Sequence, residues 1–132
     1  MGSDATITRL VEGDGSVALF ELLGEHDMAS EPALRAALNE ALADGQGIVV
    51  DLSKAEFIDS SVIHTLIDTQ QRLAAQGREL ATEVNTASVV MLALEITSFR
   101  AIVATVGTRD AAVAIARARG APPVPEPRRP QS

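Results

Sequence analysis

Residues 48–67, IVVDLSKAEFIDSSVIHTLI, contain two patterns in succession. The run 48–52 is rich in β-branched residues, which is typical of a strand that is covered on both faces. From residue 63 to residue 73 the apolar residues recur at helical spacing. The sequence therefore predicts a central strand and a following helix, with Asp-Ser-Ser at 59–61 in the turn where the helix starts.

The flanking sequence alternates between strand and helix patterns. An Asp-Gly pair at 14–15 separates two β-prone runs and predicts a hairpin. Ser30 followed by Pro32 is typical of an N-cap and the first turn of a helix, and the apolar stripe behind them ends at Gly45. In all we expect four helices, the last two near 88–94 and 108–118, and strands at 5–11, 16–23, 48–52, 79–84 and 101–106.

This order, β-β-α-β-α-β-α-β-α, predicts an α/β fold in one domain that covers residues 1–119. The sheet should be mixed, surrounded by helices, with right-handed crossovers between its parallel strands. Residues 120–132 follow, with five prolines and two adjacent arginines. Such a segment cannot form a core, so we expect an extended, disordered tail.

Composition limits the classes of protein to which the chain can belong. Its 132 residues are 46% hydrophobic, enough for a core without disulfides or a metal. The chain has no cysteine, which excludes disulfides, thiolate zinc sites and cysteine nucleophiles. No apolar run approaches the roughly 18 residues of a membrane span. We therefore expect a cytoplasmic protein that has no contact with the membrane.

Charge is distributed unevenly along the chain. The formal net charge is −7, which argues against direct nucleic-acid binding because a phosphate backbone requires a basic face. Residues 1–71 hold 13 acidic residues and 3 basic ones, a net charge of −10, whereas residues 72–132 hold 5 acidic residues and 8 arginines. A solvated acidic face and a docking surface for an arginine- or lysine-bearing partner both fit this pattern.

Ser60 is open to three interpretations. It could be a simple N-cap, or a phosphate acceptor, because the amides and dipole of a helix N-terminus also stabilise a phosphate. With His64 and Asp68 it could form a serine hydrolase triad, but three members on one helix leave no second wall for an oxyanion hole. We expect no catalytic residue, and no metal site, because His26 and His64 lack ligand spacing.

Two longer segments resemble a known family. Residues 49–73, VVDLSKAEFIDSSVIHTLIDTQQRL, resemble the strand, loop and helix of STAS domains, specifically the bacterial anti-sigma factor antagonists. Residues 22–42, LLGEHDMASEPALRAALNEAL, resemble the Gly-Glu-x-Asp segment and the helix that precede them. The likeness extends over roughly residues 5–118, and the fold that it implies, a small sheet surrounded by helices, matches the order predicted above.

The resemblance also implies roles for individual residues. The family's regulatory serine falls on Ser60, with Ser61 as the alternative phosphorylation site. The chain departs from the family pattern at Val62, where glycine is common, and at His26, where an aliphatic residue is common. The partner-binding residues implied by the resemblance, including the two loop aspartates of the family, are Glu25, His26, Asp27, Asp59, Ser60, Ser61 and Val62.

The function implied is that of an anti-sigma factor antagonist. It would bind an anti-sigma factor that is also a serine kinase, free a sigma factor, and be switched off by phosphorylation of Ser60. The kinase would supply ATP and magnesium, so the chain itself needs no cofactor, and a separate phosphatase would reset the switch. The alternatives are a non-phosphorylated STAS adaptor in a larger assembly, such as a lipid transporter or stress-sensing complex, and a nucleotide-binding sensor.

Overall fold

Six strands form one mixed sheet in the structure, a computed structural model that describes residues 5–10, 15–85 and 88–120. The strand order is β1-β2-β3-β5-β6, and β4 pairs with the second half of β2. Among the strand pairs within these ranges, only β1–β2 is antiparallel. The bounds of the strands are β1 Thr6–Leu10, β2 Val17–His26, β3 Gly47–Asp51, β4 Ala55–Ile58, β5 Leu80–Glu83 and β6 Ala104–Val106.

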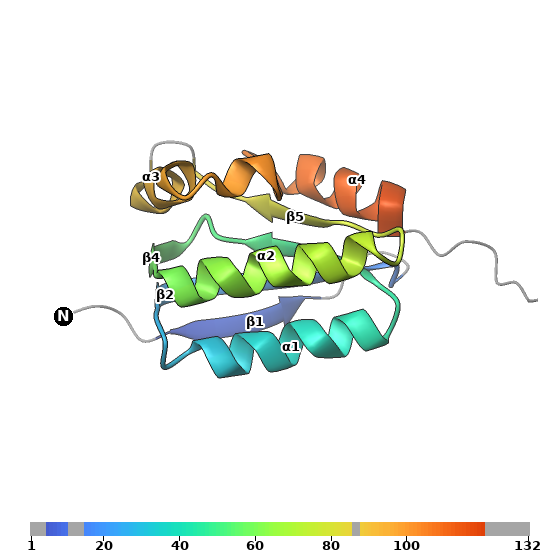
Figure 1. The fold of residues 1–132 in the computed structure, drawn as a ribbon, viewed down its shortest axis with the longest axis horizontal. Coiled ribbons are helices and arrows are strands. Elements are labelled where there is room, and N and C mark those ends of the chain that lie inside the picture. Colours follow the sequence, from blue (N-terminus) through green and yellow to red (C-terminus); the bar gives the residue numbers. More distant parts are fainter. Residues whose placement is uncertain (1–4, 11–14, 86–87, 121–132) are drawn as a thin grey trace, which may run out of the picture.

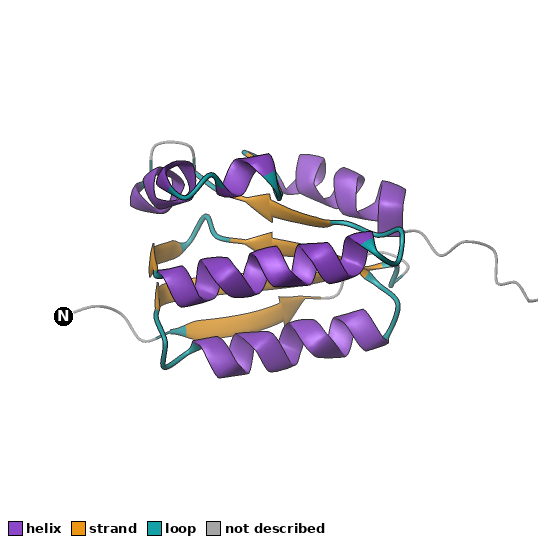
Figure 2. Ribbon diagram, viewed as in Figure 1, coloured by secondary structure: helices purple, strands orange, loops and turns teal. Residues whose placement is uncertain are grey.

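Helices cover both faces of this sheet (Figures 1 and 2). One face packs against α1, α2 and α3 through the larger core cluster, and α4 covers the other face through a smaller one. Strand β3 is buried along its whole length, as the β-branched run predicted. The helices are α1 Glu31–Ala43, α2 Ser60–Ala74, α3 Val89–Ile96 and α4 Arg109–Gly120, with a 3-10 turn, η1, at Phe99–Ala101.

Strand β2 is longer than predicted and joins two parts of the sheet. Its first half pairs with β3 and its second half with β4, and the register shifts between Gly24 and Glu25. Gly24 adopts a φ of 83°, a left-handed conformation that glycine accepts without strain. The irregularity redirects the end of β2 toward β4, and the candidate site lies at that end.

The α/β class and the mixed sheet are confirmed, but the predicted order lacked one strand. Residues 55–58 form β4 only because the end of β2 offers them a pairing edge, and four residues are too few for a periodic signal. The strand predicted at 101–106 is shorter, since η1 and a turn precede β6. Gly120, the first residue of the predicted tail, still belongs to α4, and the rest of that tail, 121–132, lies outside the described residues. No helix within the described ranges is long and apolar enough to cross a bilayer.

Candidate functional site

Two segments far apart in the sequence meet at one edge of the sheet. The backbone N–H of Asp59 donates a hydrogen bond to the His26 carbonyl at 3.1 Å, where β2 and β4 end side by side. Helices α1 and α2 both begin at this edge (Figure 1), and the Thr65 hydroxyl of α2 donates to the Glu31 carboxylate of α1. The two segments noted in the sequence therefore form one surface.

Asp59, not Ser60, caps helix α2. Its backbone is extended, and its carboxylate accepts hydrogen bonds from the backbone N–H groups of Ser61 at 3.0 Å and Val62 at 3.2 Å. The N-cap interpretation of Ser60 is therefore wrong. A carboxylate one residue earlier satisfies the free amides of the first turn, and Ser60 becomes the first residue of the helix.

The two serines at the start of α2 differ in their surroundings. Ser60 is exposed, and its hydroxyl has no hydrogen-bond partner among the described residues. The Ser61 hydroxyl donates to the Asp59 carboxylate at 2.5 Å, and Ser61 is half-buried. Ser60 thus presents an oxygen that is free to react or to contact a partner, whereas the Ser61 oxygen is held inside the cap.

Two open hollows flank the first turns of α2. The first is lined by Ser60, Ser61, Ile63, His64 and Ile67. The second lies between α1 and α2 and is lined by Glu31, Arg35, Ser61, His64, Thr65 and Asp68. Both are open toward solvent, and neither has the enclosing walls that a small-molecule site requires. Their shape fits contact with the surface of another macromolecule.

The end of β2 and the loop that follows it carry exposed acidic side chains. Glu25 and Asp27 are exposed, and the Asp27 carboxylate accepts a hydrogen bond from the Ala29 N–H at 2.9 Å, which fixes the turn. Among the described residues, no ion pair involves Glu25, Asp27 or Asp59. These carboxylates give this edge a negative potential that favours a basic partner.

His26 and Val62 differ from the sequence expectation because their side chains are buried. Both are 0% exposed, so neither can touch a partner directly. The His26 ring lies 3.0 Å from the Leu23 carbonyl through Nε2 and 3.1 Å from the Ser30 hydroxyl through Nδ1, and its desolvation lowers its pKa. Ser30 occupies the N-cap position of α1, but its side chain does not cap the helix. Its hydroxyl instead contacts the His26 ring and donates a hydrogen bond to the Asp27 carbonyl.

The hydrolase interpretation gains no support from the geometry. Ser60, His64 and Asp68 are all exposed on α2, and the carboxylate of Asp68 lies 4.0 Å from Arg72 in an ion pair along the helix. Within the described ranges, no group of three or more histidine, aspartate or glutamate side chains could hold a metal ion.

A second polar feature at this edge is the ion pair that fixes the start of α1. The Thr65 hydroxyl and the Arg35 guanidinium both donate hydrogen bonds to the Glu31 carboxylate. These bonds lower the pKa of Glu31, and the bond from Thr65 has the larger effect. This arrangement holds α1 against α2 beside Ser61. It also uses Arg35, so this cation is not left to neutralise the acidic residues of the neighbouring loop.

Comparison with known proteins assigns the family. A family model described as the STAS domain matches residues 8–112. The chain belongs to the STAS domain family. This match confirms the family resemblance that we based on residues 22–42 and 49–73. The observed sheet with its surrounding helices is also the fold that the resemblance implied.

Several relatives of this STAS domain have been named or solved. The anti-sigma-F factor antagonist RsfB of Mycobacterium tuberculosis is 32% identical over 74 residues, which span 55% of this chain and 61% of RsfB. An anti-sigma factor antagonist from Mycobacterium paratuberculosis shares 27% identity and a TM-score of 0.72, over 85% of this chain and 95% of that one. The fold is also shared by the Bacillus cell fate determinant SpoIIAA in its phosphorylated form. That structure is 18% identical in sequence and has a TM-score of 0.61, over 83% of this chain and 97% of SpoIIAA.

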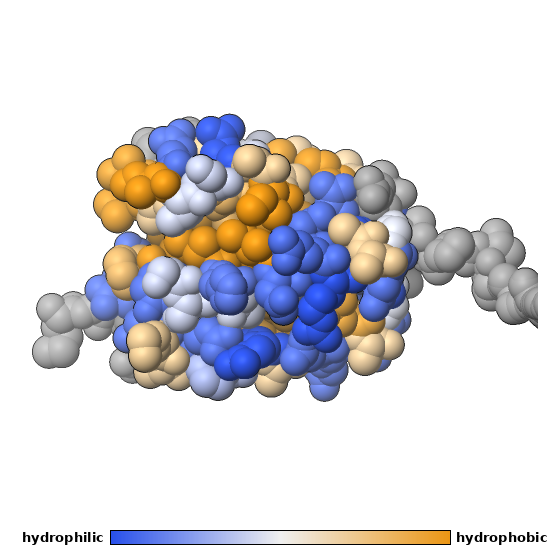
Figure 3. Space-filling model, in the orientation of Figure 1, coloured by the Kyte–Doolittle hydropathy of each residue, from blue (hydrophilic) through white to orange (hydrophobic). Residues whose placement is uncertain are grey.

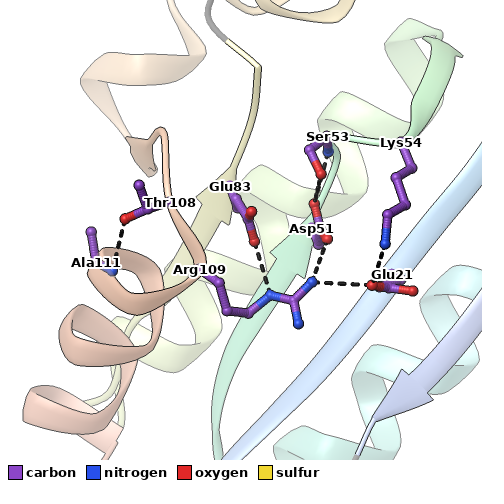
Figure 4. Close-up of polar contacts among 8 residues, drawn as sticks. All are labelled: Glu21, Asp51, Ser53, Lys54, Glu83, Thr108, Arg109 and Ala111. Atoms are coloured by element: carbon purple, nitrogen blue, oxygen red, sulfur yellow. Dashed lines mark hydrogen bonds and ion pairs between the residues drawn. The ribbon is translucent and has the colours of Figure 1, made fainter.

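The STAS domain also contains an ion-pair cluster that the sequence did not reveal. Arg109, the first residue of α4, contacts Asp51 at 2.6 Å, Glu83 at 3.0 Å and Glu21 at 3.1 Å (Figure 4). Burial opposes its charge, but hydrogen bonds to these three carboxylates outweigh burial and raise the pKa of Arg109. One signal was available: Asp51 ends a buried strand, and a buried carboxylate requires a partner.

Proposed function

We propose that this STAS domain is an anti-sigma factor antagonist that binds an anti-sigma factor with serine kinase activity and is released by phosphorylation of Ser60. The observation that carries the proposal is the exposed Ser60 hydroxyl on an acidic edge of the domain, where no described residue forms a hydrogen bond with it. The M. tuberculosis relative RsfB, an anti-sigma-F factor antagonist, supports the same class of activity. Binding of the anti-sigma factor would free its sigma factor for RNA polymerase.

The charge of the edge determines the kind of surface that would bind. Glu25 and Asp27 are exposed and have no ion-pair partner among the described residues, so arginine or lysine side chains on the anti-sigma factor would complement them. Such complementarity accelerates encounter and fixes orientation more than it adds affinity. The Asp27 side chain would also keep the loop in its bound shape through the hydrogen bond from Ala29.

The cap of α2 explains how a phosphate on Ser60 would act. Phosphorylation adds about −1.5 to −2 charges. The amides of Ser61 and Val62, which could stabilise a phosphate, already bind the Asp59 carboxylate. The phosphate would therefore lie beside a carboxylate on an acidic surface, without those amides as partners. Repulsion from the neighbouring acids and the cost of desolvating the dianion would weaken docking, with no change of fold required.

The reaction itself belongs to the partner. The kinase would bring ATP and magnesium, the Ser60 oxygen would attack the γ-phosphorus, its proton would be lost, and ADP would leave. Ser61 is a poorer acceptor because its hydroxyl is half-buried and donates to Asp59. A phosphatase would hydrolyse the phosphoserine and restore the binding form. In this scheme the chain supplies a surface and an acceptor, and takes no catalytic part.

Mass spectrometry of a kinase reaction tests the proposal. Each anti-sigma factor kinase of the source genome is purified and incubated with the chain, ATP and magnesium, and the modified peptide is sequenced. We expect one phosphate on Ser60, no incorporation in Ser60→Ala, and normal incorporation in the matched variant Ser61→Ala. Phosphate on Ser61 alone would contradict the assignment. Failure of every such kinase to bind or modify the chain would refute the proposed function.

A further inference from the structure

Helix α3 presents an apolar stripe to solvent. Val89, Leu92 and Ile96 are 67%, 55% and 74% exposed, and their spacing of three and four residues places them on one side of the helix. The exposed positions of α2 are, by contrast, almost all polar or charged, as is usual for a helix on a domain surface. An exposed stripe of large apolar residues marks a contact surface more often than single apolar residues do.

The stripe is continuous with the hollow beside Ser60. Helix α3 packs on β4, the strand that leads directly into α2. Ile67 of α2 and Ala93 of α3 are half-buried at the rim of the same core cluster. Figure 3 shows the result as an apolar band between α2 and α3, which continues onto the exposed end of α3. Ile67, together with Ile63, also lines the hollow that includes Ser60.

We infer that this α3 surface, formed by Val89, Leu92 and Ile96, is a second contact area for the same anti-sigma factor that docks at Ser60. The inference rests on the proposed function. A kinase that reaches Ser60 must lie over the hollow beside it, and the apolar band runs from that hollow to α3. The occupant would therefore place apolar side chains on the band and basic side chains on Glu25 and Asp27, the arrangement of apolar centre and polar rim seen in protein interfaces.

A second copy of this chain is the competing occupant. If two α3 surfaces paired, each copy would cover the exposed apolar stripe of the other. A dimer of that kind would account for the stripe alone. Because the apolar band reaches the hollow that Ser60 lines, the anti-sigma factor is the occupant that makes use of both features together.

The stripe gives the interface a part that phosphorylation does not alter. Val89, Leu92 and Ile96 carry no charge and lie on a different helix from Ser60, so their contribution to affinity should be the same with and without a phosphate. A substitution on α3 and a charge at position 60 should therefore weaken binding independently. In the double variant, the fold-increase in the dissociation constant should be the product of the two single increases. Independent effects distinguish a second contact area from an indirect disturbance of the Ser60 site.

The experiment uses calorimetry to measure the dissociation constant of the complex between this chain and the anti-sigma factor kinase that the phosphorylation assay identifies. Leu92→Asp and Ile96→Asp should each raise it about tenfold or more, in the unmodified chain and in Ser60→Asp alike. Ala114→Asp is the matched control, because Ala114 is exposed on α4 across the sheet, and it should change the constant less than about twofold. Circular dichroism and the thermal midpoint verify that each variant is folded.

The outcomes separate the two proposals. If the unmodified chain binds, Ser60→Asp weakens binding and the α3 variants bind as the unmodified chain does, the α3 inference is overturned and the proposed function stands. If no anti-sigma factor binds, both fail. Light scattering after gel filtration tests for self-association. If the unmodified chain is a dimer, Ile96→Asp dissociates it and kinase binding is unchanged, the stripe mediates self-association and the inference is overturned.

Discussion

The Asp59 carboxylate accepts a hydrogen bond from the Ser61 hydroxyl at 2.5 Å, and this contact distinguishes the two adjacent serines of the site. Asp59 also caps the helix through backbone amides, so one side chain both starts α2 and occupies the hydroxyl of Ser61. The neighbouring Ser60 hydroxyl is exposed and forms no hydrogen bond within the part of the chain that the structure describes. A single acidic residue therefore selects which serine is presented at the surface.

Removing the cap should destabilise the domain, whereas removing the Ser60 hydroxyl should not. We expect Asp59→Ala to lower the free energy of unfolding by about 1 to 2 kcal/mol, because the first-turn amides lose their acceptor. Ser60→Ala removes no hydrogen bond among the described residues and should stay within about 0.5 kcal/mol of the unmodified chain. Urea denaturation followed by circular dichroism measures both. A larger loss for Ser60→Ala than for Asp59→Ala would contradict the capping assignment.

Arg109 should be the most important ion-pair residue for stability. Arg109→Met leaves Asp51, which is 1% exposed, without the cation that neutralises it. We expect a loss of about 2 kcal/mol, below the usual range for a fully buried pair because the guanidinium is one-third exposed. The control is Lys54→Met, since Lys54 contacts the same cluster through Glu21 but is exposed, and its effect on the urea midpoint should be smaller. Equal midpoints for the two variants would refute the ranking.

Buried His26 should make stability depend on pH below neutrality. Its pKa is lowered from an ordinary value of about 6.5, chiefly by desolvation, so the unfolded chain takes up a proton at a higher pH than the folded chain. The stabilisation that neutral His26 provides is therefore complete above the unfolded pKa of about 6.5. It is lost as pH falls from there toward the lower pKa of the folded chain. We expect the thermal midpoint to fall between about pH 7 and pH 5, a range above the titration of ordinary carboxylates.

The two histidines of the chain provide the control for that experiment. His26→Asn should flatten the slope of the thermal midpoint against pH, whatever it does to the midpoint itself. His64 is exposed, and His64→Asn should leave the slope as it is in the unmodified chain. If the two substitutions change the slope equally, His26 is not the group responsible.

Docking on the acidic edge should depend on salt. Asp27→Asn keeps an acceptor oxygen for the Ala29 N–H but removes a charge, so the fold should be retained while the association rate with the anti-sigma factor falls. Raising ionic strength from about 0.05 M to about 0.5 M should slow association of the unmodified chain more than that of Asp27→Asn. Stopped-flow or interferometry measures both rates. Identical salt dependence in the two chains would remove Asp27 from the docking surface.

Local patterns along the chain were enough to predict much of the fold. The β-branched run at 48–52 and the helical spacing at 63–73 predicted β3 and α2, because burial on both faces and burial on one side leave different periodicities. The α/β class followed from the alternation of elements. Strand β4 was missed, because its four residues become a strand only by pairing with the end of β2.

The candidate site divides in the same way. Local pattern alone was enough to predict that Asp59, Ser60 and Ser61 lie between a strand and a helix, since chain order and helical spacing are local properties. The folded arrangement was needed to show which of them caps the helix, that His26 and Val62 are buried, and that Arg109 contacts carboxylates from three strands. The physical reason is that solvent exposure and hydrogen-bond partners depend on segments far apart in the chain, which only folding brings within a few ångströms of one another.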